Sequence, residues 1–215
     1  MTVSPDLPPA FPAHAFRRQD ETPDAYFYQA PRFVTHIDAD AIGAVTQLYR
    51  DYFRPGADLL DLMSSWVSHL PPEVAYGRVA GLGMNEAELQ ANPRLTSFVV
   101  QDLNQTPALP FADGEFDGAA ICVSIDYLTQ PVAVLCELAR VLRPGAPLVI
   151  TFSNRCFPSK AIAVWHTLDD RGHLALVRRF LEAAGGWQPV ELLDRSPNPG
   201  RTDPLLAVVA KRAVS

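Results

Sequence analysis

Polar side chains that could bind a small ligand follow the first apolar run of this sequence. Asp61 lies near the end of the run LLDLM (59–63), and Ser64 and Ser65 come directly after the run. A carboxylate accepts hydrogen bonds from amines, and backbone N–H groups in a turn that opens a helix can hold a carboxylate or phosphate. The turn contains no glycine, so a pyrophosphate could not approach the backbone closely. These residues therefore favour a ligand with a smaller anionic group over a dinucleotide.

The later apolar runs end in the same way. The further candidate positions are Gly83, Met84 and Asn85 after the second run, Asp102 and Leu103 after the third, Ser124, Asp126 and Tyr127 after the fourth, and Asn154 and Arg155 after the fifth. An amide can bond hydroxyls, Asp102 can accept from an exocyclic amine, and Leu103 can cover a flat ring. Structural roles stay open at this point, because Asp, Ser and Asn also cap helices and turns.

The elements that position these residues alternate between short apolar runs and helical stretches. Strands are expected over 59–63, 78–83, 97–102, 116–125, 147–153, 189–194 and 204–212, and helices over 38–52, 85–92, 130–142, near 159–167 and over 171–184, with a further helix-competent stretch ending near His69. Continuous apolar runs separated by helices predict a doubly wound α/β fold, a mostly parallel sheet with helices on both faces. No helix separates the last two strands, so they should pair antiparallel. In such a sheet, ligands bind at the carboxyl ends of the strands.

Composition narrows the class of protein. The 215 residues carry a net charge of −6 and no run of Lys or Arg, which argues against nucleic acid and anionic membranes as partners. No apolar stretch reaches membrane-spanning length, and the start of the chain lacks a secretory pattern. Three isolated cysteines and no metal-ligand spacing predict reduced thiols, a cytoplasmic protein and no metal site. We expect a Pro-rich flexible tail over 1–24, an N-terminal helical cover over 25–56 and the main domain over 57–215.

Five segments, namely LLDLM, RVAGLGMNEAEL, VVQDL, LPFADGEFDGA and ELARVLRPGAPLVITFSN, resemble the class I S-adenosylmethionine-dependent methyltransferases, in their small single-domain branch. The resemblance covers most of residues 57–212. It implies a Rossmann-like seven-stranded sheet with an antiparallel last strand, methyl transfer of the EC 2.1.1 class, and S-adenosylmethionine as cofactor. Carried over by position, Asp61 would hold the cofactor's amino group, Ser64 and Ser65 would face its carboxylate, and Asp102 and Leu103 would address adenine. Ser124 and Asp126 would border the methionine moiety and the acceptor.

The sequence departs from this family in the loop between Asp102 and Leu109, which is longer than usual, and at two places in the cofactor motifs. Met63-Ser64-Ser65-Trp66-Val67 stands where the family has a glycine-rich turn. Gly83 stands where the family has the acidic residue that binds both ribose hydroxyls, and Asn85 could take over part of that role. Both changes affect the expected cofactor site more than the expected fold.

The acceptor of the methyl group is expected to be a small molecule. Its pocket would combine Tyr28, Arg32 and His36 with Asp126, Tyr127, Asn154 and Arg155. Asp126 or His36 could take a proton, Tyr127 and Arg155 complete the predicted catalytic set, and the two arginines favour an anionic acceptor. Tyr28 could instead pack the cover onto the sheet.

Two other functions fit parts of the pattern. A non-catalytic relative with a regulatory or interaction role would explain the missing glycines and the missing ribose acid. A nicotinamide-dependent oxidoreductase would need a pyrophosphate-binding turn and a Tyr–Lys proton relay, and the sequence offers neither. The sequence leaves the acceptor atom and the oligomeric state open.

Overall fold

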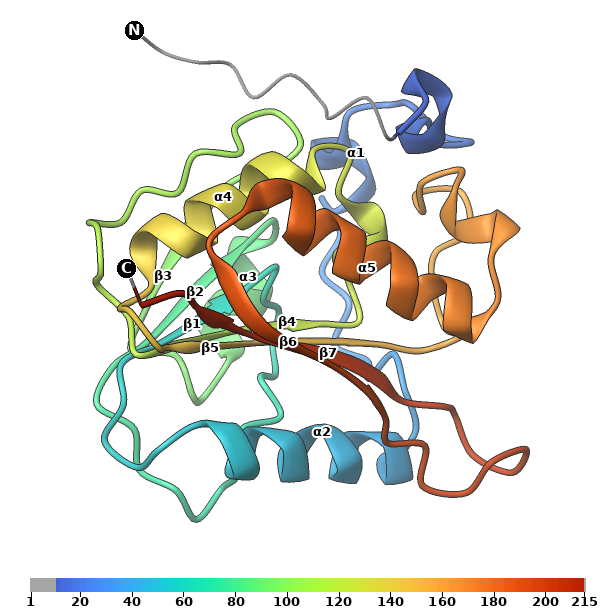
Figure 1. Cartoon of the computed structure of the whole chain (residues 1–215). Coiled ribbons are helices and arrows are strands. Elements are labelled where there is room, and N and C mark those ends of the chain that lie inside the picture. Colours follow the sequence, from blue (N-terminus) through green and yellow to red (C-terminus); the bar gives the residue numbers. More distant parts are fainter. Residues whose placement is uncertain (1–10, 215) are drawn as a thin grey trace, which may run out of the picture.

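A seven-stranded sheet forms the centre of the molecule (Figure 1). The computed structural model describes residues 11–214. The strand order is β3-β2-β1-β4-β5-β7-β6, and β7 runs antiparallel to both of its neighbours. The strands are β1 (Leu59–Leu62), β2 (Val79–Gly83), β3 (Ser97–Val100), β4 (Gly118–Cys122), β5 (Pro147–Phe152), β6 (Trp187–Asp194) and β7 (Leu206–Arg212). The doubly wound sheet with an antiparallel last strand, predicted from the sequence, is confirmed.

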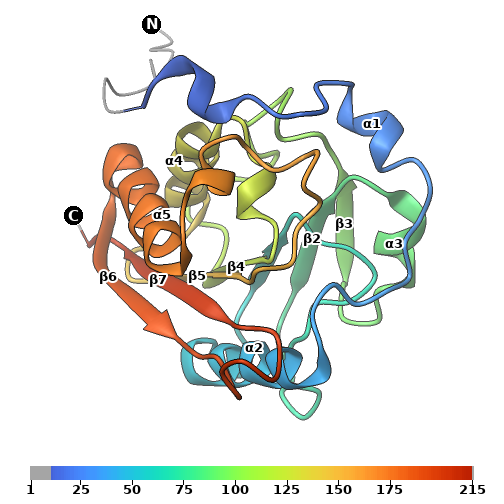
Figure 2. The ribbon, with the colours of Figure 1, turned by 90° about the vertical axis from the view of Figure 1, so that its right-hand side faces the viewer.

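Helices cover both faces of the sheet. They are α1 (Asp24–Phe27), α2 (Ala39–Tyr52), α3 (Glu86–Ala91), α4 (Pro131–Val141) and α5 (Asp170–Ala184), with short 3-10 turns η1 (Ala13–Phe16), η2 (Ile125–Tyr127) and η3 (Trp165–Thr167). Figures 1 and 2 show α2 on one face and α4 and α5 on the other. Each layer buries an apolar stripe, as Val45 and Leu48 of α2 and Leu135 and Leu138 of α4 illustrate.

The segment after β1 contains no helix, so the helix expected to end near His69 is wrong. Backbone carbonyls that a helix would use accept side-chain hydrogen bonds instead: Asn92 donates to Ser65 O, and Thr46 donates to His69 O. His69 has a φ of 53°, in the left-handed region that interrupts a right-handed helix. The Ser64–Ser65 turn therefore does not open a helix.

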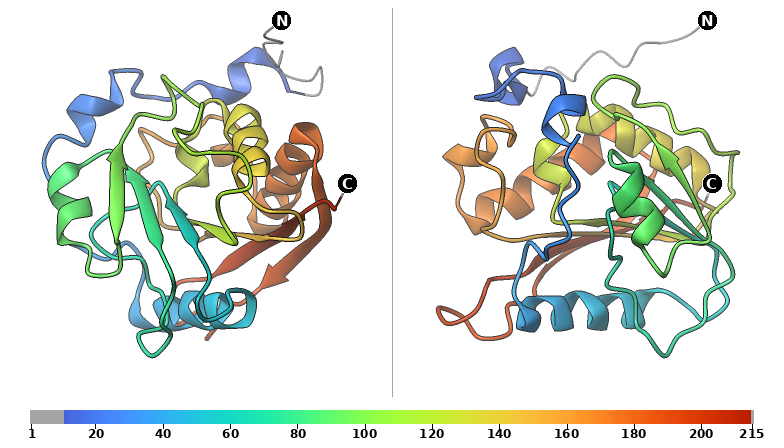
Figure 3. Two further views of the ribbon diagram at one scale, coloured as in Figure 1. Left: turned by 90° about the vertical axis from the view of Figure 1, so that its left-hand side faces the viewer. Right: turned by 180° about the vertical axis from the view of Figure 1, so that it is seen from behind.

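The N-terminal part packs onto the domain. Phe11 and Phe16 are buried against Phe180 of α5, with ring centroids 5.3 and 5.9 Å from it, so residues 11–24 do not form the loose tail predicted for 1–24. Residues 1–10 lie outside the described part of the chain. After η1 and α1 the chain crosses the carboxyl ends of the strands and reaches α2, as both views of Figure 3 show. We call residues 24–37 the strap.

Within residues 11–214, no helix combines the length and the apolar character needed to cross a membrane.

Candidate active site

One pocket lies where β1, β2, β3 and β4 end, beneath the strap. Its volume is about 130 Å³. The strand order brings these ends together, because β1 lies between β2 and β4 and all four strands are parallel. Nine residues predicted from the sequence to bind the cofactor line this pocket: Asp61, Ser64, Ser65, Gly83, Met84, Asn85, Asp102, Leu103 and Ser124. We call it the strand-tip pocket.

Asp61 is the buried carboxylate at the end of β1. Its Oδ2 accepts hydrogen bonds from Ser64 Oγ at 2.7 Å and from Ser68 Oγ at 2.6 Å. Burial raises the pKa of Asp61 to about 6, and the two hydroxyls oppose that rise because they stabilise the charged form. Asp61 is thus a carboxylate that can still ionise near neutral pH inside the pocket.

The turn after β1 adopts the backbone conformation that usually needs glycine. Met63 has a φ of 58°, and Ser64 N donates to Leu82 O at 2.8 Å, which holds the turn against β2. The turn therefore keeps a left-handed residue next to Asp61, although its side chains differ from those of a glycine-rich turn.

The tips of β3 and β4 supply further polar groups. Asp102 accepts from Asn104 N at 2.9 Å and from Gln105 Nε2 at 3.0 Å, which fixes its carboxylate. Ser124 is 8% exposed, and its Oγ has no hydrogen-bond partner among the described residues. A buried hydroxyl without a partner is costly, so Ser124 Oγ is a group that a ligand could satisfy.

The strap supplies the other wall. Arg32 stacks on aromatic rings, with Cζ 4.4 Å from the centroid of Phe27 and 5.4 Å from that of Phe157. Its Nη2 donates to Phe27 O, whereas its buried Nη1 has no partner among the described residues. His36 packs edge-on against Phe157, with ring centroids 5.3 Å apart. Partial desolvation lowers the pKa of His36, which favours the neutral ring at pH 7.

The residues predicted for the acceptor pocket divide into two groups. Tyr28, Arg32, His36 and Tyr127 line the strand-tip pocket. Asp126, Asn154 and Arg155 are not among its lining residues.

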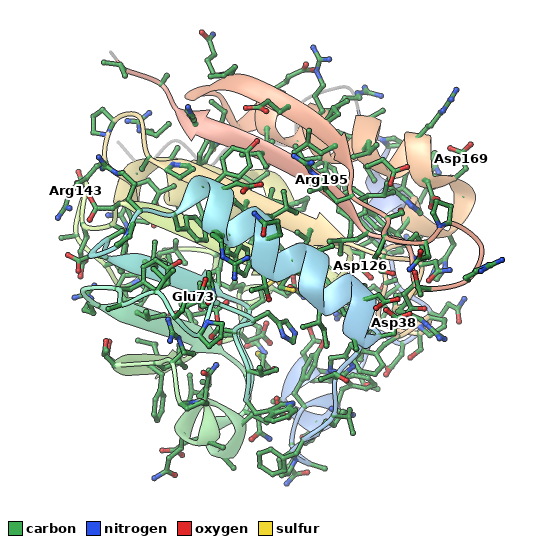
Figure 4. The ribbon with its side chains drawn as sticks, turned by 90° about the horizontal axis from the view of Figure 1, so that it is seen from below. Asp38, Glu73, Asp126, Arg143, Asp169 and Arg195 are labelled. Atoms are coloured by element: carbon green, nitrogen blue, oxygen red, sulfur yellow. The ribbon has the colours of Figure 1, made fainter. Side chains whose placement is uncertain are left out.

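Arg155 points away from the pocket, because its guanidinium pairs with Asp203 at 2.8 Å on the surface. Asp126 is 3% exposed in η2, and burial raises its pKa to about 8. In Figure 4 it lies toward the same end of the molecule as Asp38, the N-cap of α2, with Arg143 toward the other end. A carboxyl that is mostly protonated at pH 7 is a poor general base, so Asp126 does not fit its predicted catalytic role. Arg155 does not fit its own predicted role, because it does not line the pocket and its guanidinium pairs with Asp203.

Sequence reasoning missed several lining residues. Glu88 and His69 reach the pocket from α3 and from the irregular segment after β1, and Phe157 reaches it from the loop after β5. His69 was expected on a helix surface. Burial and the nearby His36 lower its pKa. In the sequence, Glu88 could have been found from its place directly before Leu89, because these two are the buried residues of the short helix α3. No three His, Cys, Asp or Glu side chains within 11–214 are placed to share a metal ion.

Comparison with known proteins finds a family match over part of the chain. Residues 66–150 match the family described as "Methyltransferase domain". A curated relative, demethylmenaquinone methyltransferase of Renibacterium salmoninarum, is 28% identical over 142 residues, which cover 65% of this chain and 56% of the relative. The chain thus matches little more than half the length of that enzyme.

Two solved structures are similar in fold. An S-adenosylmethionine-dependent methyltransferase from Mesorhizobium loti has a TM-score of 0.55 at 16% identity, covering 79% of this chain and 98% of the other. The [4+2]-cyclase SpnF has a TM-score of 0.57 at 17% identity, covering 80% and 81%. Residues 66–150 of this chain thus match a methyltransferase domain, and the sheet has the fold of the solved S-adenosylmethionine-dependent methyltransferase.

Proposed function

We propose that this chain is an S-adenosylmethionine-dependent methyltransferase that acts on a small-molecule acceptor. One observation carries the proposal: the nine residues selected from sequence for the cofactor line a single pocket at the carboxyl ends of the strands. The family match and the curated relative support the same activity.

The residues of the pocket fit this cofactor. Met84 and Leu103 offer apolar surface for adenine beside the Asp102 carboxylate, and Asp61 offers an acceptor for an ammonium group. Within residues 11–214 the buried Ser124 Oγ and Arg32 Nη1 have no hydrogen-bond partner, and both are donors for a ligand rich in acceptors. When bound, the cofactor supplies a methyl group on a positively charged sulfur.

His36 is our candidate for the group that takes a proton from the acceptor. Its lowered pKa leaves the ring neutral at pH 7, and a neutral imidazole can accept a proton from a hydroxyl or amine. The hydroxyls of Tyr28 and Tyr127 stay protonated, since burial holds their pKa values well above the usual value. Phe157, which packs against His36, excludes water from one side of the site.

We further propose that the acceptor carries a negatively charged group. Arg32 is the one arginine or lysine among the described residues that line the pocket, and its Nη1 is free. A guanidinium pairs well with carboxylate or phosphate. Arg155, also predicted from sequence to bind this group, no longer supports the idea because it pairs with Asp203.

A non-catalytic, ligand-free relative is the second candidate. It is favoured by the turn after β1, where Ser64 and Ser68 already satisfy Asp61 Oδ2 and which opens no helix. SpnF, named as a cyclase, also illustrates that one fold hosts different chemistries.

Binding of adenosyl compounds distinguishes the methyltransferase from the non-catalytic relative. Isothermal titration of the purified chain with S-adenosylmethionine and S-adenosylhomocysteine, together with mass spectrometry of small molecules that co-purify, tests the site without a known acceptor. We expect saturable binding of both compounds and about tenfold weaker binding in Asp102→Asn, which loses a charged acceptor. No heat and no thermal shift with either compound would leave the second candidate.

A further inference from the structure

The end of β2 cannot hold a side chain that binds a nucleoside. A Cβ on Gly83 would lie 2.2 Å from the backbone oxygen of Ser64, where no atom fits. The clash is with backbone, and the hydrogen bond from Ser64 N to Leu82 O keeps that backbone in place. In sheets of this type an acidic residue near this position binds a ribose hydroxyl. A ribose in this pocket needs its acceptor from another residue.

Asn85, the nearest polar residue, is already occupied. Its Oδ1 accepts from Glu88 N at 3.1 Å as the N-cap of α3. Its Nδ2 donates to Tyr28 O at 2.9 Å and to Gln29 O at 3.2 Å, which ties the strap to α3. Because these bonds already use the amide oxygen and nitrogen, Asn85 is a weak candidate for binding the ribose hydroxyls. The sequence had suggested Asn85 for part of that role.

Glu88 lies one turn further along α3 and has the required chemistry. Its side chain lines the strand-tip pocket and is 8% exposed. Oε1 accepts from Arg32 N at 2.6 Å, and within residues 11–214 Oε2 has no hydrogen-bond partner. A buried carboxylate is costly unless donors surround it, and one backbone N–H satisfies only part of its capacity.

The other carboxylates that line the pocket either accept hydrogen bonds on both oxygens already or do not lie beside β2. Asp24 accepts from Arg18 on both oxygens, and Asp102 accepts from Asn104 N and Gln105 Nε2 on one oxygen each. Asp61 lies in β1 rather than beyond β2. Glu88 is thus the lining carboxylate on the β2 side that has an oxygen to offer.

We propose that Glu88 binds the ribose hydroxyls of the adenosyl cofactor, in place of a residue at the end of β2. This inference rests on the proposed function, because it assumes that an adenosyl compound occupies the pocket. An ionised carboxylate accepts from both hydroxyls of a vicinal diol, and such bonds are stronger than those to a neutral amide. The same carboxylate holds Arg32 N, so it joins the strap to the ligand.

The experiment compares Glu88→Gln with wild type by isothermal titration. The probes are S-adenosylhomocysteine and its 2′-deoxy and 3′-deoxy analogues. Gln keeps an oxygen for Arg32 N, so the strap contact is preserved while the charge is lost. We expect Glu88→Gln to bind S-adenosylhomocysteine about 10- to 100-fold more weakly than wild type, from the usual strength of hydrogen bonds to charged groups. We also expect the wild type, but not the variant, to prefer S-adenosylhomocysteine over the deoxy analogues.

Glu86→Gln is the matched control, because Glu86 lies on the same short helix and is exposed. It should bind all three probes as wild type does. If Glu88→Gln still discriminates against the deoxy analogues as strongly as wild type, Glu88 only anchors the strap and the inference is overturned. A wild-type chain that binds none of the probes would instead contradict the proposed function, so the two failures are distinguishable.

Discussion

Single carboxylates in this protein differ in function because their surroundings differ. Asp61 lies near the end of β1 and Asp126 follows β4, and burial raises the pKa of both, to about 6 and about 8. Asp61 faces the strand-tip pocket with two hydroxyls on one oxygen, whereas Asp126 Oδ2 has no partner among the described residues. Of these two, Asp61 is the one suited to hold a ligand as an anion at neutral pH.

Asp126 gives a test of pH-dependent stability. Its folded pKa of about 8 exceeds the usual 3.8, so the folded chain keeps a proton that the unfolded chain loses. Stability is therefore lost as pH rises from about 4 to about 8. Urea unfolding at pH 5 and pH 8.5 should show a smaller loss in Asp126→Asn than in wild type, with a difference of up to several kcal/mol.

Other titrating groups, Asp61 included, are present in both chains and cancel in that comparison. If the two chains lose the same free energy of unfolding between these pH values, Asp126 does not carry the proton assigned to it.

At the scale of elements, the sequence predicted strands and helices well where the pattern was long or its boundaries were strong. Asp38 and Pro55-Gly56 bound α2, and the continuous apolar runs identify the central strands. The segment after β1 was not predictable in this way. Its residues are competent for a helix, but Asn92 and Thr46, which lie far away in sequence, take its carbonyls. The rule that ligands bind at the carboxyl ends of parallel strands identified nine residues that line the pocket. It did not identify Glu88, because whether that side chain reaches the pocket depends on how α3 is rotated.

The contact between the β1 turn and β2 gives a prediction for an element. Gly83→Ala should lower the free energy of unfolding by about 1–3 kcal/mol, because the new methyl meets the backbone of Ser64 and forces the strands to shift. Gly43→Ala in α2 is the control. Its Cβ would meet nothing within 4 Å, and alanine favours the helix by up to about 1 kcal/mol.

Urea unfolding with circular dichroism measures both variants. Equal stability of Gly83→Ala and wild type would mean that the turn yields easily, and the steric argument for the β2 tip would fail.

At the scale of the molecule, a buried charge network holds the strap to the body of the domain. Lys160 is fully buried, and its Nζ lies 3.2 Å from Asp24 Oδ1 and 3.1 Å from Asp20 Oδ2. Arg18 Nη1 donates to both carboxylate oxygens of Asp24 at 2.8 Å. Asn104 Nδ2 also donates to Asp24. The sequence did not predict this network, because Lys160 and Asp24 are far apart in the chain and a lone lysine carries no periodic signal.

Removing the central charge should loosen the strap. Asp24→Asn leaves Arg18 and Lys160 with less compensation, and we expect a loss of about 3–5 kcal/mol in the free energy of unfolding. Limited proteolysis should then cut within residues 11–37 faster than in wild type. Arg178→Ala, which breaks the exposed pair with Glu182, is the control and should change stability by about 0.5 kcal/mol or less. Similar effects of the two substitutions would contradict a network that anchors the strap.

The path of the strap also bears on the proposed function. The region shared with the family, residues 66–150, contributes Gly83, Asp102 and Ser124 to the pocket, whereas Arg32 and His36 come from outside it. Under the proposed function, the tips of β2 and β3 that lie within the family match meet the nucleoside, and the strap, which lies outside the match, meets the acceptor. Under that proposal, substitutions in the strap would change the choice of acceptor without altering Gly83, Asp102 or Ser124 at the strand tips.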